Sequence, residues 1–189
     1  MEKKYHAEIT SLFQEYADYL FNYAITRVND QETAEDLVQE TFISALKNYG
    51  SFQNKSKAST WLTAILKNKI IDLYRKKVRE YRQESLDDLT RFEDFFDEKG
   101  HWKKDALPSD WKVSTDRLVE QKEFYDILQL CLTRLSELQR IAFVMKHMDD
   151  ARTEEICKEL DITASNYWVI VHRAKLQLRQ CIEKHWINA

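Results

Sequence analysis

The sequence predicts an all-α protein, on three observations. Its 189 residues include only two glycines and one proline, and strands and hairpins need such turn residues in larger number. Hydrophobic residues make up 43% of the chain and charged residues 32%, a composition typical of a folded globular protein. Apolar residues recur every three or four positions over most of the chain, which is the period of an amphipathic helix.

Three helices are expected in the first part of the chain. The apolar stripe of the first runs from Ile9 to Tyr23, and that of the second runs from Ala34 to Tyr49 with Asp30 as a helix N-cap. The third stripe runs from Trp61 to Val78, and Ser59 is its expected N-cap.

An acidic linker is expected at residues 83–116. This stretch holds ten acidic and five basic residues, the single proline and one of the two glycines, and it has no sustained helical period. It divides the chain into two predicted helical domains, residues 1–82 and 117–189. The linker also carries several aromatic residues, which either pack back on a domain or contact a partner.

Four helices are expected after the linker. The first covers Leu118 to Leu135, and Ser136 then opens the Ser-x-x-Gln pattern of a capping box. Thr153 is the expected N-cap of a short helix, and Thr163 that of a last helix ending near His185.

The last two helices have the spacing of a helix-turn-helix. Ile156, Leu160, Ile162, Tyr167 and Ile170 fall at its apolar positions. In that motif the second helix lies in the major groove and its outer side chains read base edges, although an ordinary helical hairpin is the alternative. The side chains expected to face outward are Ser165, Asn166, Trp168, Val169, His172 and Arg173.

Basic residues gather toward the end of the third predicted helix. They are Lys67, Lys69, Arg75, Lys76, Lys77, Arg79 and Arg82. Such a cluster neutralises backbone phosphates, and the nearby rings of Tyr49, Phe52 and Trp61 suit unstacked bases of a single strand. The alternative is a set of core aromatics beside a solvated basic face, which is the favoured explanation for Trp61 taken alone.

No residue pattern of an enzyme, a cofactor site or a membrane protein is found, so we expect none of these. The N-terminus has no apolar stretch typical of a signal peptide. Cys131, Cys157 and Cys181 are scattered and odd in number, so we expect buried thiols in a reducing cytoplasm. A zinc site using Cys181 and His185 is a weak alternative, because no CxxC pair accompanies it, and no metal is expected.

Several segments resemble sigma-70-class sigma factors of bacterial RNA polymerase. The segment 34–42, AEDLVQETF, is similar to their motif for binding the polymerase core. Segments 59–68, STWLTAILKN, and 71–77, IDLYRKK, resemble the part that melts promoters and reads the −10 element. Segments 135–143, LSELQRIAF, 153–160, TEEICKEL, and 172–179, HRAKLQLR, resemble the domain that reads the −35 element.

The resemblance implies a two-domain sigma factor of the extracytoplasmic-function (ECF) subfamily, with region 2 before the linker and region 4 after it. It implies that one face of the second helix docks on the clamp helices of the largest polymerase subunit, through Asp36, Gln39, Glu40, Ile43 and Lys47. It also implies that the loop 50–58 captures a flipped −10 base. The implied −10 contacts are Asn48, Phe52, Asn54, Lys55, Trp61, Lys67, Asn68, Asp72, Arg75 and Lys76. For the −35 element the resemblance adds Thr153 to the outward-facing residues of the last helix.

The family also implies a cytoplasmic protein, monomeric when free, with promoter DNA, polymerase core and an anti-sigma factor as partners. Two features depart from its pattern: Asp161 stands where a glycine is usual, and the reading helix has few basic residues. Two other functions stay open on sequence alone. One is a helical adaptor or anti-activator that never touches DNA, and the other is a plain helix-turn-helix repressor.

Overall fold

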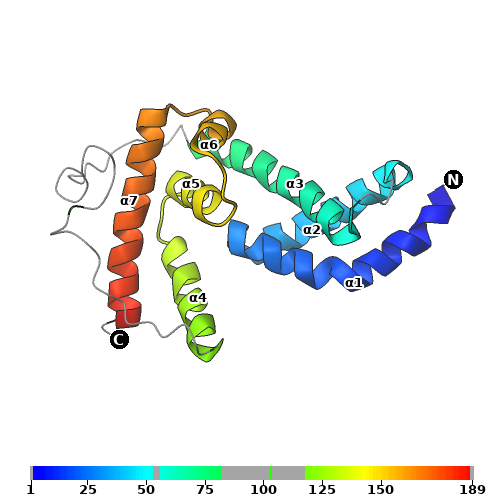
Figure 1. Ribbon diagram of the computed structural model, residues 1–189, viewed down its shortest axis with the longest axis horizontal. Coiled ribbons are helices and arrows are strands. Elements are labelled where there is room, and N and C mark those ends of the chain that lie inside the picture. Colours follow the sequence, from blue (N-terminus) through cyan, green and yellow to red (C-terminus); the bar gives the residue numbers. More distant parts are fainter. Residues whose placement is uncertain (1, 53–55, 82–102, 104–117, 188–189) are drawn as a thin grey trace. The chain divides into compact units, whose positions relative to one another are not determined.

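The structure, a computed structural model, describes residues 2–52, 56–81, 103 and 118–187, and it is all-α over these residues, as predicted (Figure 1). Of the predicted linker, only Lys103 lies among the described residues. The main helices are α1 (Glu2–Val28), α2 (Gln31–Asn48), α3 (Ala58–Tyr81), α4 (Leu118–Leu132), α5 (Glu137–His147), α6 (Thr153–Leu160) and α7 (Ala164–Ile182). A 3-10 turn, η1 (Tyr49–Ser51), follows α2, and a π-helical turn, η4 (Glu183–Ile187), follows α7.

The chain forms two compact units, residues 1–76 and 77–189. In the first unit α1 packs along α2, and α3 contributes apolar side chains to the buried interior. The interior is formed by Leu20, Ala24, Ala34, Leu37, Val38, Phe42, Ala45, Leu62, Leu66, Ile70 and Tyr74. These residues follow the stripes expected from the sequence.

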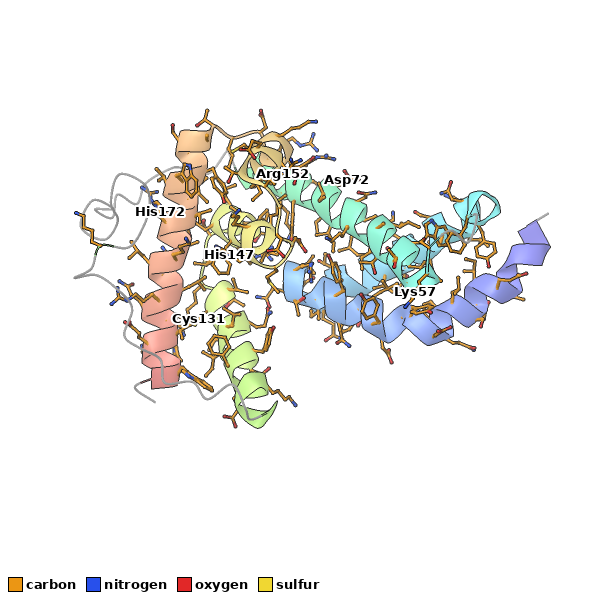
Figure 2. All side chains as sticks on the ribbon, viewed as in Figure 1. Lys57, Asp72, Cys131, His147, Arg152 and His172 are labelled. Carbon is orange, nitrogen blue, oxygen red and sulfur yellow. A yellow bond between two sulfur atoms is a disulfide. The ribbon has the colours of Figure 1, made fainter. Side chains whose placement is uncertain are left out.

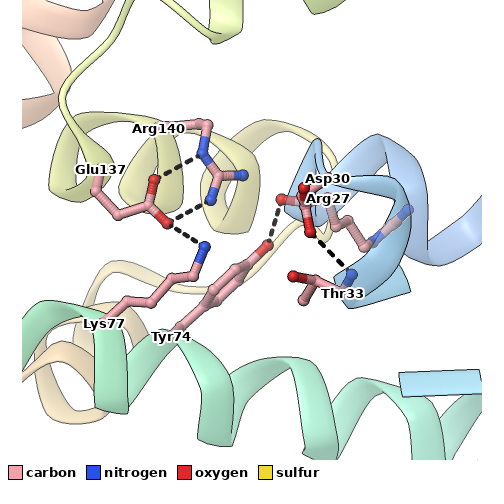
Figure 3. A network of polar contacts seen from close by, with 7 residues as sticks. All are labelled: Arg27, Asp30, Thr33, Tyr74, Lys77, Glu137 and Arg140. Carbon is pink, nitrogen blue, oxygen red and sulfur yellow. Dashed lines mark hydrogen bonds and ion pairs between the residues drawn. The ribbon is translucent and has the colours of Figure 1, made fainter. Parts of the chain in front are cut away.

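The turn between α1 and α2 is fixed by polar contacts at both of its ends (Figure 3). The hydroxyl of Tyr74 on α3 donates a buried hydrogen bond of 3.1 Å to the carbonyl oxygen of Arg27 in the last turn of α1. Asp30 caps α2 as predicted, because its Oδ2 accepts a 2.8 Å hydrogen bond from the backbone N–H of Thr33. Asn29, between them, takes a left-handed conformation with φ 54°, which asparagine tolerates better than most residues.

In the second unit α4, α5 and α6 all pack on α7. The capping box at the start of α5 is confirmed, since Ser136 Oγ accepts from the Gln139 N–H and Gln139 Oε1 accepts from the Ser136 N–H. Thr163 caps α7 as expected.

Two predicted caps are wrong by a short distance. Ser59 lies inside α3, which begins at Ala58. Thr153 is the first residue of α6, and Arg152 occupies the N-cap position, where its backbone N–H donates to Glu155 Oε2 at 3.1 Å. A glutamate three residues along satisfies the free N–H at this helix start, so the threonine hydroxyl is not needed there.

Cys131 and Cys181 are joined in a disulfide, so the expectation of three separate thiols is wrong for this pair. Only Cys157 carries a free thiol. The two bonded positions lie 50 residues apart in the sequence, and the packing of α4 on α7 brings them together. A cross-link closing a loop of this length stabilises a fold by about 4 kcal/mol in the chain-entropy model.

The alternative zinc site needed the Cys181 sulfur together with His185. That sulfur is bonded to Cys131 instead. Among the described residues no three histidine, cysteine or acidic side chains gather as metal ligands would. None of the helices in the described ranges has the length and apolar character needed to span a membrane.

A buried arginine is held at the start of α5. Arg140 donates hydrogen bonds of 2.7 and 3.1 Å to the two carboxylate oxygens of Glu137 (Figure 3). Partial burial by itself would raise the pKa of Glu137, but the hydrogen bonds and charges of its basic partners, led by Arg140, outweigh burial and lower it. Because the folded state then prefers the ionised carboxylate, the pair contributes stability at neutral pH that is lost as the pH falls through the lowered pKa.

We therefore expect Glu137→Gln to lower the free energy of unfolding at pH 7 by roughly 1–3 kcal/mol, and by much less near pH 3. Urea unfolding at the two pH values measures the difference. Glu123→Gln is the matched control, since Glu123 is an exposed carboxylate of α4. An equal loss at both pH values for Glu137→Gln would show that the charge of Glu137 does not matter.

Candidate nucleic-acid and polymerase interfaces

One face of α2 is exposed along its whole length. Its residues Asp36, Gln39, Glu40, Ile43 and Lys47 are all exposed. Helix geometry places them opposite the buried stripe that contains Leu37, Val38 and Phe42. We call these five residues the docking face. They lie together as expected, with apolar Ile43 among polar neighbours.

Glu40 has a partner that the sequence did not reveal. Its Oε2 forms an ion pair with Lys69 Nζ on α3 at a distance of 3.0 Å. The pair ties the docking face to the basic helix, and it also removes Lys69 from the set of free cations expected on α3.

The aromatic residues around the loop after α2 form a compact group. The rings of Phe52 and Trp61 stack with centroids 4.4 Å apart and planes 16° apart. Tyr49 packs against both rings with centroid distances of 6.1 Å. Trp61 and Phe52 are half-buried, so part of the group is open to solvent.

The exposed face of α3 continues from this aromatic group. Asn68, Asp72, Arg75 and Lys76 share one face at spacings of four, seven and eight residues, and Lys67 lies at its edge. Trp61 belongs to the same face, because it precedes Asn68 by seven residues. Trp61, Asn68, Asp72 and Arg75 therefore lie on one side of α3. We call these residues, together with Lys67 and Lys76, the α3 face. Asn48 is exposed nearby, while Asn54 and Lys55 lie outside the described residues.

Only some cations on the α3 face are unengaged. Arg75 forms a 2.6 Å ion pair with Asp72, one turn away (Figure 2 labels Asp72). Lys67 and Lys76 are exposed and form no ion pair with the described residues. These two lysines can therefore meet a phosphate without first breaking a contact inside the protein.

The second unit contains the expected helix-turn-helix. α6 ends at Asp161, which adopts the left-handed conformation with φ 52° and ψ 50°. The backbone N–H of Ile162 then returns to the Cys157 carbonyl oxygen at 3.0 Å, which closes the turn. Asp161 thus fills a position that usually favours glycine, at the cost of left-handed strain.

The start of α7 presents an apolar surface to solvent. Ser165, Trp168 and Val169 lie on one exposed face, and the exposed fractions of Trp168 and Val169 are 44% and 38%. Asn166 and Arg173 are partly exposed beside it, and Thr153 is partly exposed at the start of α6. Tyr167 lies fully buried behind this face, with its ring 5.2 Å from that of Trp168. We call Ser165, Asn166, Trp168 and Val169 the reading face.

His172 does not face outward as expected. Its side chain is only 8% exposed, and its ring packs 5.9 Å from the ring of Trp168 (Figure 2). The side chain follows Trp168 by one helical turn and packs against it. His172 therefore positions the tryptophan rather than offering a free polar edge.

A group of cations beside α7 was not predicted. Partial burial, followed by the charge of Lys146 on α5, lowers the pKa of Lys175. Partial burial and the charges of Lys175 and Lys146 also lower the pKa of His147. Burial is the largest cause of both shifts, and the neighbouring lysine charges add to it. Lys175 follows Trp168 by seven residues and so lies on the same side of α7.

Comparison with known proteins gives the family. A model of sigma-70 region 2 matches residues 12–80, and a model of sigma-70 region 4 matches residues 125–178. A probable RNA polymerase sigma factor from Haemophilus influenzae is 41% identical over 171 residues, covering 90% of this chain and 88% of the relative. The chain belongs to the sigma-70 family of RNA polymerase sigma factors.

Further relatives place this sigma factor in the ECF subfamily. The ECF sigma factor SigW of Bacillus subtilis is 28% identical over a match that covers 87% of this chain and 83% of the SigW chain. A solved structure of the sigma factor RpoE with the anti-sigma factor NepR, from Bartonella quintana, aligns with a TM-score of 0.42 at 22% identity, covering 93% of this chain and 97% of that one. The matches to sigma-70 regions 2 and 4 and to relatives named as sigma factors make this chain a promoter-recognising sigma factor of RNA polymerase, and its family is one of transcription factors rather than enzymes.

Proposed function

We propose that this sigma factor divides its work between its two units. Region 2, at residues 1–82, docks on the polymerase core and holds the melted −10 strand. Region 4, at residues 117–189, reads duplex DNA at the −35 element, and residues 83–116 link the two. The protein works in the cytoplasm without catalytic activity of its own, is monomeric when free, and is held in check by an anti-sigma factor.

The observation that supports this proposal best is the separation of three exposed surfaces. The docking face, the α3 face and the reading face lie on segments that match the sigma regions in the expected order. Each surface is exposed because the opposite side of its helix is buried, so none of them is needed to hold its own unit together.

The docking face suits a protein partner with complementary charge. Ile43 offers apolar surface that a partner can bury, which releases water from it. Asp36 and Gln39 offer hydrogen-bonding groups around it. We infer that the clamp helices of the largest polymerase subunit bind here.

Changing Asp36 and Gln39 to lysine should abolish binding to core, because two positive charges would replace an acid and an amide at the contact. Co-purification with core and promoter-dependent transcription with purified core measure the loss. The matched control is Gln14→Lys with Asp18→Lys, which makes the same substitutions at exposed positions of α1.

Control and wild-type proteins should transcribe equally. If the wild-type protein binds no core and supports no promoter-dependent transcription, it is an adaptor or a repressor instead. A repressor would still bind duplex DNA tightly without polymerase. Core binding at wild-type yield by the docking-face variant would show that core docks elsewhere.

The α3 face suits a single strand of DNA. The half-buried rings of Phe52 and Trp61 can stack with an unpaired base, and Lys67 and Lys76 can hold the phosphates on either side of it. Asn48, Asn54, Lys55 and Asn68 would add polar contacts, and Asp72 would keep Arg75 oriented along the strand.

Replacing Lys67 or Lys76 with alanine should reduce the salt dependence of open-complex formation by roughly one unit of log–log slope each. The loss should be equal at promoters with different −10 sequences, because phosphates carry no sequence information. Open complexes assembled with holoenzyme at several salt concentrations provide the measurement. Lys122→Ala, which removes the same charge from α4, should leave the slope unchanged. A slope that is unchanged for both α3 variants would contradict these phosphate contacts.

The reading face is suited to thymine methyl groups and to adenine. Trp168 and Val169 offer apolar surface, which packs against the C5 methyl of thymine in the major groove. Asn166 can form a bidentate contact with adenine, and Ser165 can reach a base or a phosphate. Thr153, Arg173, Lys146 and Lys175 would hold the flanking phosphates, and so provide the charge that the reading helix lacks.

Replacing the −35 thymines one at a time by deoxyuridine should therefore weaken binding by about three- to fourfold at the contacted position, the effect of one buried methyl group. Trp168→Ala should weaken binding to the normal site and remove this preference for thymine over deoxyuridine. Fluorescence anisotropy with −35 duplexes and holoenzyme measures both effects.

Asn166→Ala is the matched control on the same face. It should keep the thymine preference and relax selection at one adenine by roughly 1–3 kcal/mol. If Trp168→Ala loses affinity while the thymine preference persists, Trp168 contacts the DNA backbone rather than a methyl group.

A further inference from the structure

The second unit holds a disulfide that the proposed function does not use. Cys131, labelled in Figure 2, lies at the C-terminal end of α4. Cys181 lies at the C-terminal end of α7, and the two Cα atoms are 5.7 Å apart. The bond joins the first helix of the unit to the helix that carries the reading face.

The bond lies inside the apolar cluster that attaches α4 to the rest of the unit. The buried members of this cluster, besides the two cysteines, are Leu132, Leu135, Ala174, Leu178 and Ile182. Phe124 on α4 and Trp186 in η4 close its outer side, with their rings 5.7 Å apart and nearly perpendicular. The same side chains would surround two thiols equally well, because a reduced cysteine packs as a small apolar residue.

The place where this protein acts makes the bond unusual. This step rests on the proposed function: a subunit of RNA polymerase works in the reducing cytoplasm. Disulfides are rare there, and those that form are typically transient and serve catalysis or redox sensing. A cross-link between two helices of a cytoplasmic protein therefore points to a bond that is made and broken.

We propose that Cys131 and Cys181 are a reversible redox pair, oxidised by hydrogen peroxide and reduced by a dithiol, and that oxidation locks α4 onto α7. Oxidation then stabilises region 4 without altering the reading face, which lies at the opposite end of α7 from Cys181. Reduction leaves α4 attached by apolar contacts alone, so it opens more readily.

Atoms and electrons balance in both the oxidation and the reduction of the cysteine pair. Cys181 is 7% exposed and Cys131 only 1%, so reaction begins at Cys181. In oxidation the Cys181 thiolate attacks one oxygen of hydrogen peroxide. The products are a sulfenic acid on Cys181 and a hydroxide ion, and the hydroxide takes up a proton to give water. The Cys131 thiolate then attacks the Cys181 sulfur and releases the second water. In reduction one thiolate of the dithiol attacks the Cys181 sulfur and displaces Cys131 as a thiolate, which takes up a proton. The second thiol of the reductant resolves the mixed disulfide, so two electrons and two protons pass to the pair.

The test uses the full chain with Cys157→Ala, which removes the remaining thiol. The protein is treated with dithiothreitol or with hydrogen peroxide, then denatured and alkylated with N-ethylmaleimide. Peptide masses should show both cysteines alkylated after dithiothreitol and both protected after peroxide. Thermal unfolding should show Tm of the C-terminal unit higher by on the order of 10 °C or more in the oxidised protein. Dithiothreitol added to the native, oxidised protein should return it to the lower Tm.

Cys131→Ala with Cys181→Ala, in the same background, is the control that should not respond to peroxide. If that variant does not fold, the oxidised and reduced forms of the parent still provide the comparison. Alkylation of either cysteine after excess peroxide, equal Tm values in the two states, or a bond that dithiothreitol cannot open in the native protein would each overturn the proposal. None of these readouts involves core or promoter DNA, so they are independent of failure in the transcription test.

Discussion

The buried side of α7 is the feature on which the second unit depends. This helix packs against α4, α5 and α6 at once, through side chains that include Tyr167, Ile170, Val171, Ala174 and Leu178. Residues on the buried side of α7 are needed for the fold. Residues available to contact a partner are therefore confined to its exposed side. The reading face is therefore short and lies at the start of the helix. The disulfide lies at the other end of the same helix, away from the reading face.

Ion pairs within the protein decide which of its many charges are available to partners. The chain has a net charge of −3, which by itself suggests no affinity for nucleic acid. On α3, however, Lys69 and Arg75 are held by Glu40 and Asp72, whereas Lys67 and Lys76 are exposed. A basic cluster in a sequence thus overstates the phosphate contacts that a helix can make. The same pairs orient the side chains they engage, and that order lowers the entropic cost of binding a strand.

Region 4 draws its positive charge from beside its reading helix. Lys175 on α7 has a lowered pKa because it is partly buried and because the charge of Lys146 on α5 lies nearby. Under the proposed function these charges would supply affinity for phosphates, and apolar side chains of the reading face such as Trp168 would supply specificity.

The sequence by itself determined the secondary structure and the order of the regions. Stripes with helical period located the seven α-helices of the described residues, and Asp30, Ser136 and Thr163 marked three helix starts correctly, because caps and periodicity are local properties. Motif order also identified the family, and the five α2 residues expected to contact the core are exposed. Only the tertiary structure decided that Glu40 meets Lys69 and that Cys131 and Cys181 meet. The contacts of His172 with Trp168 and of Arg75 with Asp72 lie within one helix, and the sequence left open only whether these side chains turn toward each other. These outcomes depend on how far a side chain turns or on where two distant helix positions come together. Residue spacing along one helix fixes a face, but it carries no information about the partner that another helix brings to that face.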